Sequence, residues 1–268
     1  MFTYDFTRKA LIGFAAFSLS AVAANAASLS ISITNHSQSD GLFLTPLYVA
    51  FHDGSFDAFN EGEAASAGVE LIAEEGSPAG LPPERLAVAP TSQGGVVFGP
   101  EGFAGAPVID PGETASLLID VDEDNRYFTF LSMVIPSNDT FIGNDNPLAY
   151  EIFDAAGAFT GIGDILVYGG DAWDAGTEAD NGEGAAFSTN DNPSIDQNGV
   201  VRRESTLDFL LGSETVAGTT IFSVPDQKDL LATISISEVS EVPLPAGAPL
   251  ILSGLGALGF MRWRKKRS

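Results

Sequence analysis

The sequence predicts an all-β fold, an antiparallel β-sandwich with a short helical insertion. Three observations support this prediction. Segments near both ends of the central region alternate apolar and polar residues, which is the period-two pattern of a half-buried strand. Other segments are rich in β-branched and aromatic residues, which favour strands. Turn residues (Gly, Asn, Asp and Pro) recur about every ten residues, as expected for the short strands of a sandwich.

Each expected element follows from its own segment. LSISITN and LATISISEV alternate, and TASLLIDV and RYFTFLSMVIP are β-branched and aromatic with the turn DEDN between them; these four strands cover residues 29–35, 231–239, 114–121 and 126–136. DILVYG and LDFLL predict two further short strands. A short helix is expected over Ser66–Glu75, and the polar residues 179–199 are expected to form a long surface loop.

The first 26 residues are typical of a secretory signal peptide. Arg8 and Lys9 precede the apolar stretch from Ala10 to Ala23, and Ala24-Asn25-Ala26 has the pattern of a cleavage site. A buried N-terminal helix is the alternative. Export predicts a mature domain over residues 27–241, placed in the cell envelope or outside the cell.

The last 27 residues, 242–268, combine a Pro-containing motif, an apolar run and a basic end. The apolar run Ala246–Met261 has 16 residues, fewer than the roughly 20 of a spanning helix. The cations after it would keep this end in the cytoplasm. The arrangement resembles VPLPA-type sorting tails, relatives of the PEP-CTERM signals, which an exosortase-like protease recognises. The motif here is Val242, Pro243, Leu244, Pro245 and Ala246. A plain membrane anchor is the alternative, and in either case the membrane is contacted only through this hydrophobic C-terminal helix, transiently or permanently.

Charge and composition exclude several classes of function. Residues 27–241 hold 35 acidic and five basic residues, so the domain repels nucleic acid and anionic lipid and attracts cations. The chain has no cysteine, which excludes disulfides, thiol catalysis and cysteine-based zinc sites.

Two clusters concentrate carboxylate and amide oxygens beside glycines. They are PSNDTFIGNDN, residues 136–146, and GGDAWDAGTEADNGEG, residues 169–184. Calcium takes six to eight hard oxygen ligands, which these segments offer. Neither segment has the spacing of an EF-hand, and in so acidic a chain solvated acidic loops are the alternative.

The same clusters resemble the spondin domain, the N-terminal module of F-spondin and mindin. The family's Pro-Ser-Pro-Asp-Trp-Phe-Val-Gly reads PSNDTFIG here, over residues 136–143, and its Asp-Ala-Gly-Thr-Asp reads DAGTE, over residues 174–178. Residues 47–66 look like the early segment of bacterial forms, and the similarity extends with gaps over residues 28–239. Thr140 stands where the family has tryptophan and Asn138 where it has proline.

The resemblance implies a sandwich that binds one calcium ion near one edge. By motif, Asp139 and Asp174 fall on calcium-binding aspartates. An ungapped count back along the chain places Asp120 on the family's third carboxylate, and Glu178 replaces a further aspartate. The missing tryptophan puts in doubt any partner surface built around it.

Catalytic patterns are scarce, so no enzymatic activity is expected. There is no HExxH, the domain has no GxSxG, and His52 is expected to be a packed or turn residue. The predicted function is a secreted or surface-tethered calcium-binding module for adhesion to an extracellular protein or polysaccharide. Two alternatives stay open: an envelope hydrolase that uses acidic pockets, and a metal-free structural envelope protein.

Overall fold

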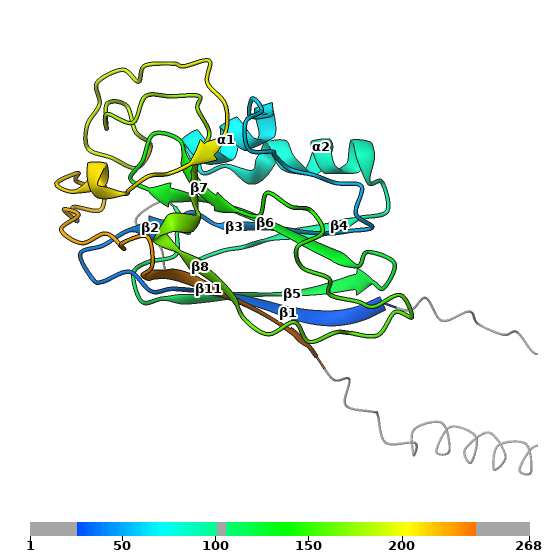
Figure 1. The fold of residues 1–268 in the computed structure, drawn as a ribbon. Coiled ribbons are helices and arrows are strands. Elements are labelled where there is room, and N and C mark those ends of the chain that lie inside the picture. Colours follow the sequence, from blue (N-terminus) through cyan, green and yellow to red (C-terminus); the bar gives the residue numbers. More distant parts are fainter. Residues whose placement is uncertain (1–25, 101–105, 240–268) are drawn as a thin grey trace, which may run out of the picture.

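The computed structural model describes residues 26–100 and 106–239, which form two antiparallel β-sheets packed face to face (Figure 1). This confirms the predicted β-sandwich. The predicted signal peptide, apart from Ala26, and the predicted sorting tail lie outside the described residues. Among the helices of the described part, none is both long enough and apolar enough to cross a membrane.

One sheet has four strands in the order β5-β1-β11-β8. Their bounds are Thr114–Asp122 (β5), Ala26–Asn35 (β1), Leu230–Glu238 (β11) and Ile165–Tyr168 (β8). On β1 the side chains of Leu29, Ile31 and Ile33 are buried against the other sheet, and the residues between them are half-buried. The alternation in the sequence therefore predicted both the strand and its inner face.

The other sheet has seven strands, six of them in the order β10-β9-β7-β6-β3-β4, with β2 also paired to β6. Their bounds are Arg202–Arg203 (β10), Ala172–Asp174 (β9), Thr140–Gly143 (β7), Tyr127–Ile135 (β6), Leu47–His52 (β3), Gln93–Val97 (β4) and Phe43–Leu44 (β2). β6 is buried along almost its whole length. Because the four-stranded sheet covers one of its faces and helices cover the other, its sequence does not alternate.

Two helices, α1 (Ala67–Glu75) and α2 (Leu81–Val88), lie on the outer face of the seven-stranded sheet (Figure 1), joined by the 3₁₀ turn η1 (Pro78–Gly80). Val69 and Ile72 of α1 belong to a second apolar core, which also contains Leu131 and Trp173 of the sheet. α1 begins as predicted, since the Ser66 side chain accepts a hydrogen bond from the Val69 N–H at 3.2 Å.

The structure differs from the sequence predictions in two places. α2 was not predicted; its prolines, Pro82 and Pro83, lie in its first turn, where proline is tolerated. LDFLL is a 3₁₀ turn, η3 (Asp208–Leu210), and not a strand; its buried residues Leu207 and Leu210 are three apart, which fits a helical turn. A further 3₁₀ turn, η2 (Gly169–Asp171), links β8 to β9. Residues 179–199 form the predicted long loop without a regular element.

Gly76, which ends α1, is expected to tolerate no side chain. Its φ is +65°, and a Cβ atom there would lie 2.4 Å from Cγ2 of Thr45. We expect Gly76→Ala to lower the free energy of unfolding by about 2–3 kcal/mol, as the sum of backbone strain and the steric clash. Gly62→Ala is the matched control, because Gly62 has φ +86° but open space around it. Denaturant unfolding measures both variants. Equal losses of unfolding free energy in the two would show that the clash with Thr45 does not contribute.

Candidate metal centre

Asp139 lies in the turn between β6 and β7 and is fully buried. Its Oδ2 accepts hydrogen bonds from the backbone N–H of Thr177 at 2.7 Å, from the backbone N–H of Glu178 at 3.0 Å and from the Thr177 hydroxyl at 3.2 Å. One oxygen of the carboxylate is thereby fixed. The other, Oδ1, has no hydrogen-bond partner within the described part of the chain.

Asp174 is the last residue of β9 and lies opposite Thr140 of the neighbouring strand β7. It too is fully buried, and its Oδ1 accepts a hydrogen bond from the Gly176 N–H. The turn after Asp174 requires glycine, because Gly176 has φ +72° and a Cβ there would lie 2.6 Å from the Val200 carbonyl oxygen. Strand pairing thus brings the two predicted aspartates to one end of the sheet.

Asp180 completes a cluster that the sequence did not predict. Carboxylate oxygens of Asp139, Asp174 and Asp180 all lie within 4.8 Å of one another. Two ligands of one calcium ion, each about 2.3–2.6 Å from it, are at most about 5 Å apart. The separation therefore fits three ligands of a single ion.

Unpaired buried oxygens support the same interpretation. Asp139 Oδ1, Asp180 Oδ1 and the Thr140 hydroxyl are buried, and none has a hydrogen-bond partner among the described residues. Leaving a buried polar atom unpaired is unfavourable, and such atoms need an explanation, for example an ion. The donor set consists only of hard oxygens, which suits calcium better than zinc or copper.

Burial and mutual repulsion raise the pKa values of Asp139 and Asp180. Burial raises the pKa of Asp139; the N–H of Glu178 opposes that rise, and the charge of Asp174 adds to it. Burial also raises the pKa of Asp180 to about 8, with the charges of Asp139 and Asp174 as the next causes. A nearby cation would therefore favour the ionised form of these aspartates.

Arg202 and Glu204 border the cluster. Arg202 on β10 pairs in register with Asp174, and its guanidinium forms an ion pair with Asp174 Oδ2, although without good hydrogen-bond geometry. Burial raises the pKa of Glu204 to about 7, and the negative charge of Asp174 is the next cause of this rise. The guanidinium and one divalent ion would together neutralise the three clustered aspartates.

The other two predicted ligands are not in this cluster. Asp120 lies on β5 in the four-stranded sheet, is exposed, and accepts a hydrogen bond from the Ser28 hydroxyl at 2.5 Å. An ungapped count could not show that β5 and β6, consecutive in the chain, belong to different sheets. Glu178 lies beside the cluster, where its backbone N–H binds Asp139 and its side chain accepts from Asn138 at 3.3 Å.

Asn138, one of the two departures from the family motif, holds the loop that carries Asp180. Its side-chain oxygen accepts from the Gly182 N–H at 2.9 Å, and its Nδ2 donates to the Glu183 carbonyl at 2.9 Å. The family's proline could make neither bond. This asparagine therefore fixes the loop at Gly182 and Glu183, shortly after Asp180.

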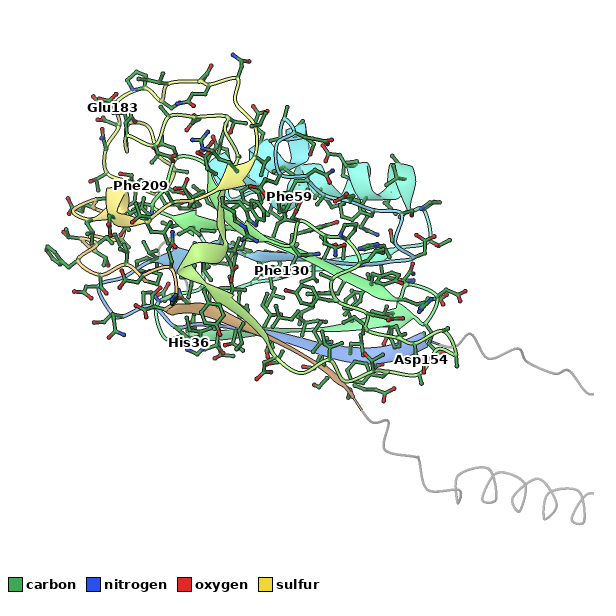
Figure 2. The ribbon with its side chains drawn as sticks, viewed as in Figure 1. His36, Phe59, Phe130, Asp154, Glu183 and Phe209 are labelled. Carbon is green, nitrogen blue, oxygen red and sulfur yellow. The ribbon has the colours of Figure 1, made fainter. Side chains whose placement is uncertain are left out.

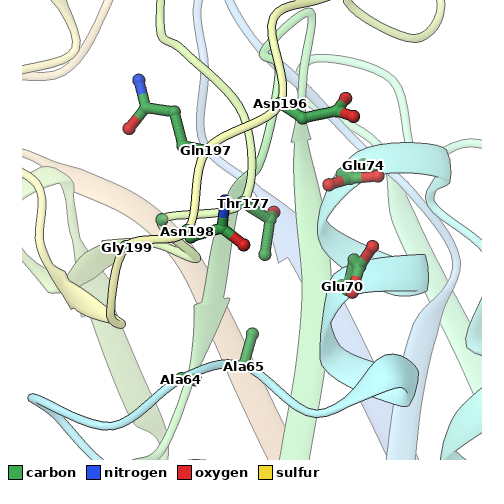
Figure 3. Close-up of a pocket in the computed structure, with 10 residues that line it drawn as sticks. Ala64, Ala65, Glu70, Glu74, Thr177, Asp196, Gln197, Asn198 and Gly199 are labelled. Atoms are coloured by element: carbon green, nitrogen blue, oxygen red, sulfur yellow. The ribbon is translucent and has the colours of Figure 1, made fainter.

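A cavity of about 420 Å³ adjoins the cluster, between α1 and the loop over residues 196–199. Figure 3 shows Glu70 and Glu74 on the helix, with Thr177 and Asp196 on the other side. Burial raises the pKa of Glu74 to about 7, and a hydrogen bond from Thr177 opposes the shift. With three carboxylates in its lining, this cavity disfavours anions.

His52 is a packed residue, as predicted. It is fully buried; its Nε2 lies 3.0 Å from the Thr129 hydroxyl, and its Nδ1 accepts from the Gly54 N–H at 3.1 Å. Burial lowers its pKa to about 4. The nearby Ser55 hydroxyl donates instead to Asp53, so these three neighbours do not form a catalytic triad.

The structure brings the two spondin-like motifs, at Asp139 and Asp174, into one site. The model of the family Spondin_N matches residues 39–209, more than half of the chain. The chain belongs to the spondin family. All three clustered aspartates lie within the matched region of this spondin domain. Spondin domains are non-enzymatic modules. A comparison with curated proteins finds no match to the chain.

Proposed function

We propose that this spondin domain is an exported, calcium-binding adhesion module that contacts an extracellular protein or polysaccharide. The observation that supports it most is the trio of buried Asp139, buried Asp174 and half-buried Asp180, in which Asp139 and Asp180 each carry a buried oxygen without a hydrogen-bond partner among the described residues. In this proposal the trio would hold one calcium ion. The ion would supply the positive charge that links the β6–β7 turn to the loop after β9.

Calcium would act on the surface of the module through this link. Asp139 and Asp174 lie on adjacent structural elements, whereas Asp180 belongs to a loop with few regular contacts. An ion shared by all three would restrain the loop over residues 179–199 and so present it in one conformation to a partner. Export and sorting of the chain through residues 242–246 stay predictions, since both ends lie outside the described residues.

Thermal unfolding of the purified chain tests the calcium site. Calcium at about 100 times its dissociation constant is expected to raise the melting temperature by roughly 5–10 °C over chelator, and magnesium by much less. Asp139→Asn combined with Asp174→Asn should abolish the shift. Asp120→Asn is the matched control and should retain it, because Asp120 lies in the other sheet.

Single variants separate the ligand set proposed here from that predicted by the sequence. Asp180→Asn should reduce the calcium-dependent shift strongly, whereas Glu178→Gln should reduce it little. Melting curves that are identical in calcium and chelator would refute the metal site. The domain would then be a spondin fold with another binding surface.

A further inference from the structure

A second cavity, of about 340 Å³, is lined by β8 of one sheet and by β6, β7 and β10 of the other. None of the three clustered aspartates lines it. Its apolar side includes Phe130, labelled in Figure 2, which belongs to the core between the sheets. The volume lies within the usual range of small-ligand sites, near its lower end.

The apolar side of this cavity is partly open to solvent. Tyr150 is half-buried, with its ring 6.2 Å from that of Phe130 and tilted by 39°. Leu166 of β8 is 47% exposed. An aromatic ring and an aliphatic side chain at a cavity mouth offer a flat apolar surface, and the tyrosine adds a hydroxyl that can donate or accept.

The charged side chains on the polar side of this cavity are partly exposed, and several contacts hold them. The Arg203 guanidinium lies 3.7 Å above the centre of the Trp173 ring, and its Nη1 is 3.5 Å from Asp171 Oδ1. Asp171 Oδ2 accepts from the Tyr168 N–H at 2.9 Å, which fixes the carboxylate. Donors and acceptors thus stand side by side in fixed positions, which limits the entropy lost on binding.

Charge decides what kind of ligand fits. Two carboxylates, Asp145 and Asp171, and one guanidinium line the cavity, in a chain with a formal charge of −24. An anion would be repelled by the domain, and a cation would have to compete with the Arg203 guanidinium, which already pairs with Asp171. A neutral ligand avoids both the repulsion and the competition. If it carries neighbouring hydroxyls, these can accept hydrogen bonds from Arg203 and donate hydrogen bonds to Asp171.

We propose that this cavity binds one neutral saccharide unit, with the apolar face of the sugar ring against Tyr150 and its hydroxyls on Arg203 and Asp171. The site goes beyond the calcium proposal, since it shares no residue with the aspartate trio. It gives the adhesion module a contact with glycans that does not depend on the metal.

The test is a titration of the full chain with methyl glucoside, methyl mannoside, methyl galactoside, N-acetylglucosamine and methyl glucuronide. Calorimetry or ligand-observed NMR gives the affinity, and tryptophan fluorescence, to which Trp173 beside Arg203 contributes, gives a second signal. A neutral sugar is expected to bind with a dissociation constant on the order of millimolar. Arg203→Gln and Tyr150→Ala should each weaken it by about tenfold or more. Affinity should be equal in calcium and in chelator.

Arg126→Gln is the matched control, because Arg126 also pairs with a carboxylate, Glu151, and lies over a ring, Tyr127, but does not line the cavity. It should bind sugar as the unmodified chain does. If Arg203→Gln does not fold, Tyr150→Phe removes one hydroxyl, keeps the ring and should still weaken binding. Absence of binding up to about 100 mM sugar, tighter binding of the glucuronide, or full affinity in the variants would overturn the proposal.

Discussion

Calcium binding to this spondin domain is expected to weaken about 50-fold when the pH falls from 8 to 6. A metal ligand must be deprotonated, and burial with neighbouring charges raises the pKa of Asp180 to about 8. Below pH 8 the ion must therefore displace a proton, which lowers the apparent affinity by up to tenfold per unit. The raised pKa of Asp139 acts in the same direction. Calcium titrations at several pH values measure the effect.

Asp180→Asn provides the control for this prediction. It removes the carboxyl whose pKa is raised to about 8, so the variant should bind calcium more weakly at pH 8, and its calcium affinity should depend less on pH. An affinity that stays constant between pH 8 and 6 in the unmodified chain would show that the aspartates are already ionised. Calcium binding would then not be coupled to the release of a proton.

Without metal, the same carboxyls predict the opposite trend for stability. The folded chain keeps protons on Asp180 and Glu204 that the unfolded chain releases, because both pKa values are raised in the fold. Stability in chelator should fall by about 1–2 kcal/mol as the pH rises from 6.5 to 8.5, after allowance for solvent screening. His52 does not interfere, since its pKa of about 4 affects stability only below pH 6.5. A melting temperature that rises with pH in chelator would contradict this.

Trp173→Ala is expected to lower the free energy of unfolding by about 3–5 kcal/mol. The ring is 1% exposed, packs edge-to-face on Phe59 at 5.1 Å, and donates its Nε1–H to the Gly143 carbonyl at 3.0 Å. Its loss would leave a large cavity between the sheet and α1. A domain is stable by only about 5–15 kcal/mol, so the melting temperature should drop by roughly 10 °C.

The same substitution should also weaken calcium binding, because Asp174 follows Trp173 on β9. Trp173→Phe separates the two roles: it keeps a ring in the core, loses only the hydrogen bond to Gly143, and should cost about 1–2 kcal/mol. Calcium-dependent stabilisation should survive in that variant. If Trp173→Ala unfolds like the unmodified chain, the second core contributes less than its burial indicates.

Local patterns predicted most of the sandwich. β1 and β11 alternate because one face of the four-stranded sheet meets solvent, and this pattern is visible in the sequence alone. The helix predicted over Ser66–Glu75 corresponds to α1. α2 was missed, and the turn η3 was assigned as a strand. The local sequence of either segment, with prolines in one and a short apolar run in the other, does not show which residues will pack against it.

For the candidate site, the sequence by itself determined the family, the oxygen-rich chemistry and two of the three clustered aspartates, Asp139 and Asp174, because short motifs keep these residues next to the turns that shape them. Only the tertiary structure decided the third. Asp120 and Asp180 are equally acidic, but strand pairing places Asp120 in the other sheet, whereas Asn138 and the turn at Gly176 direct the loop so that Asp180 reaches the cluster. Proximity between distant residues depends on pairing and loop closure, which no local pattern records.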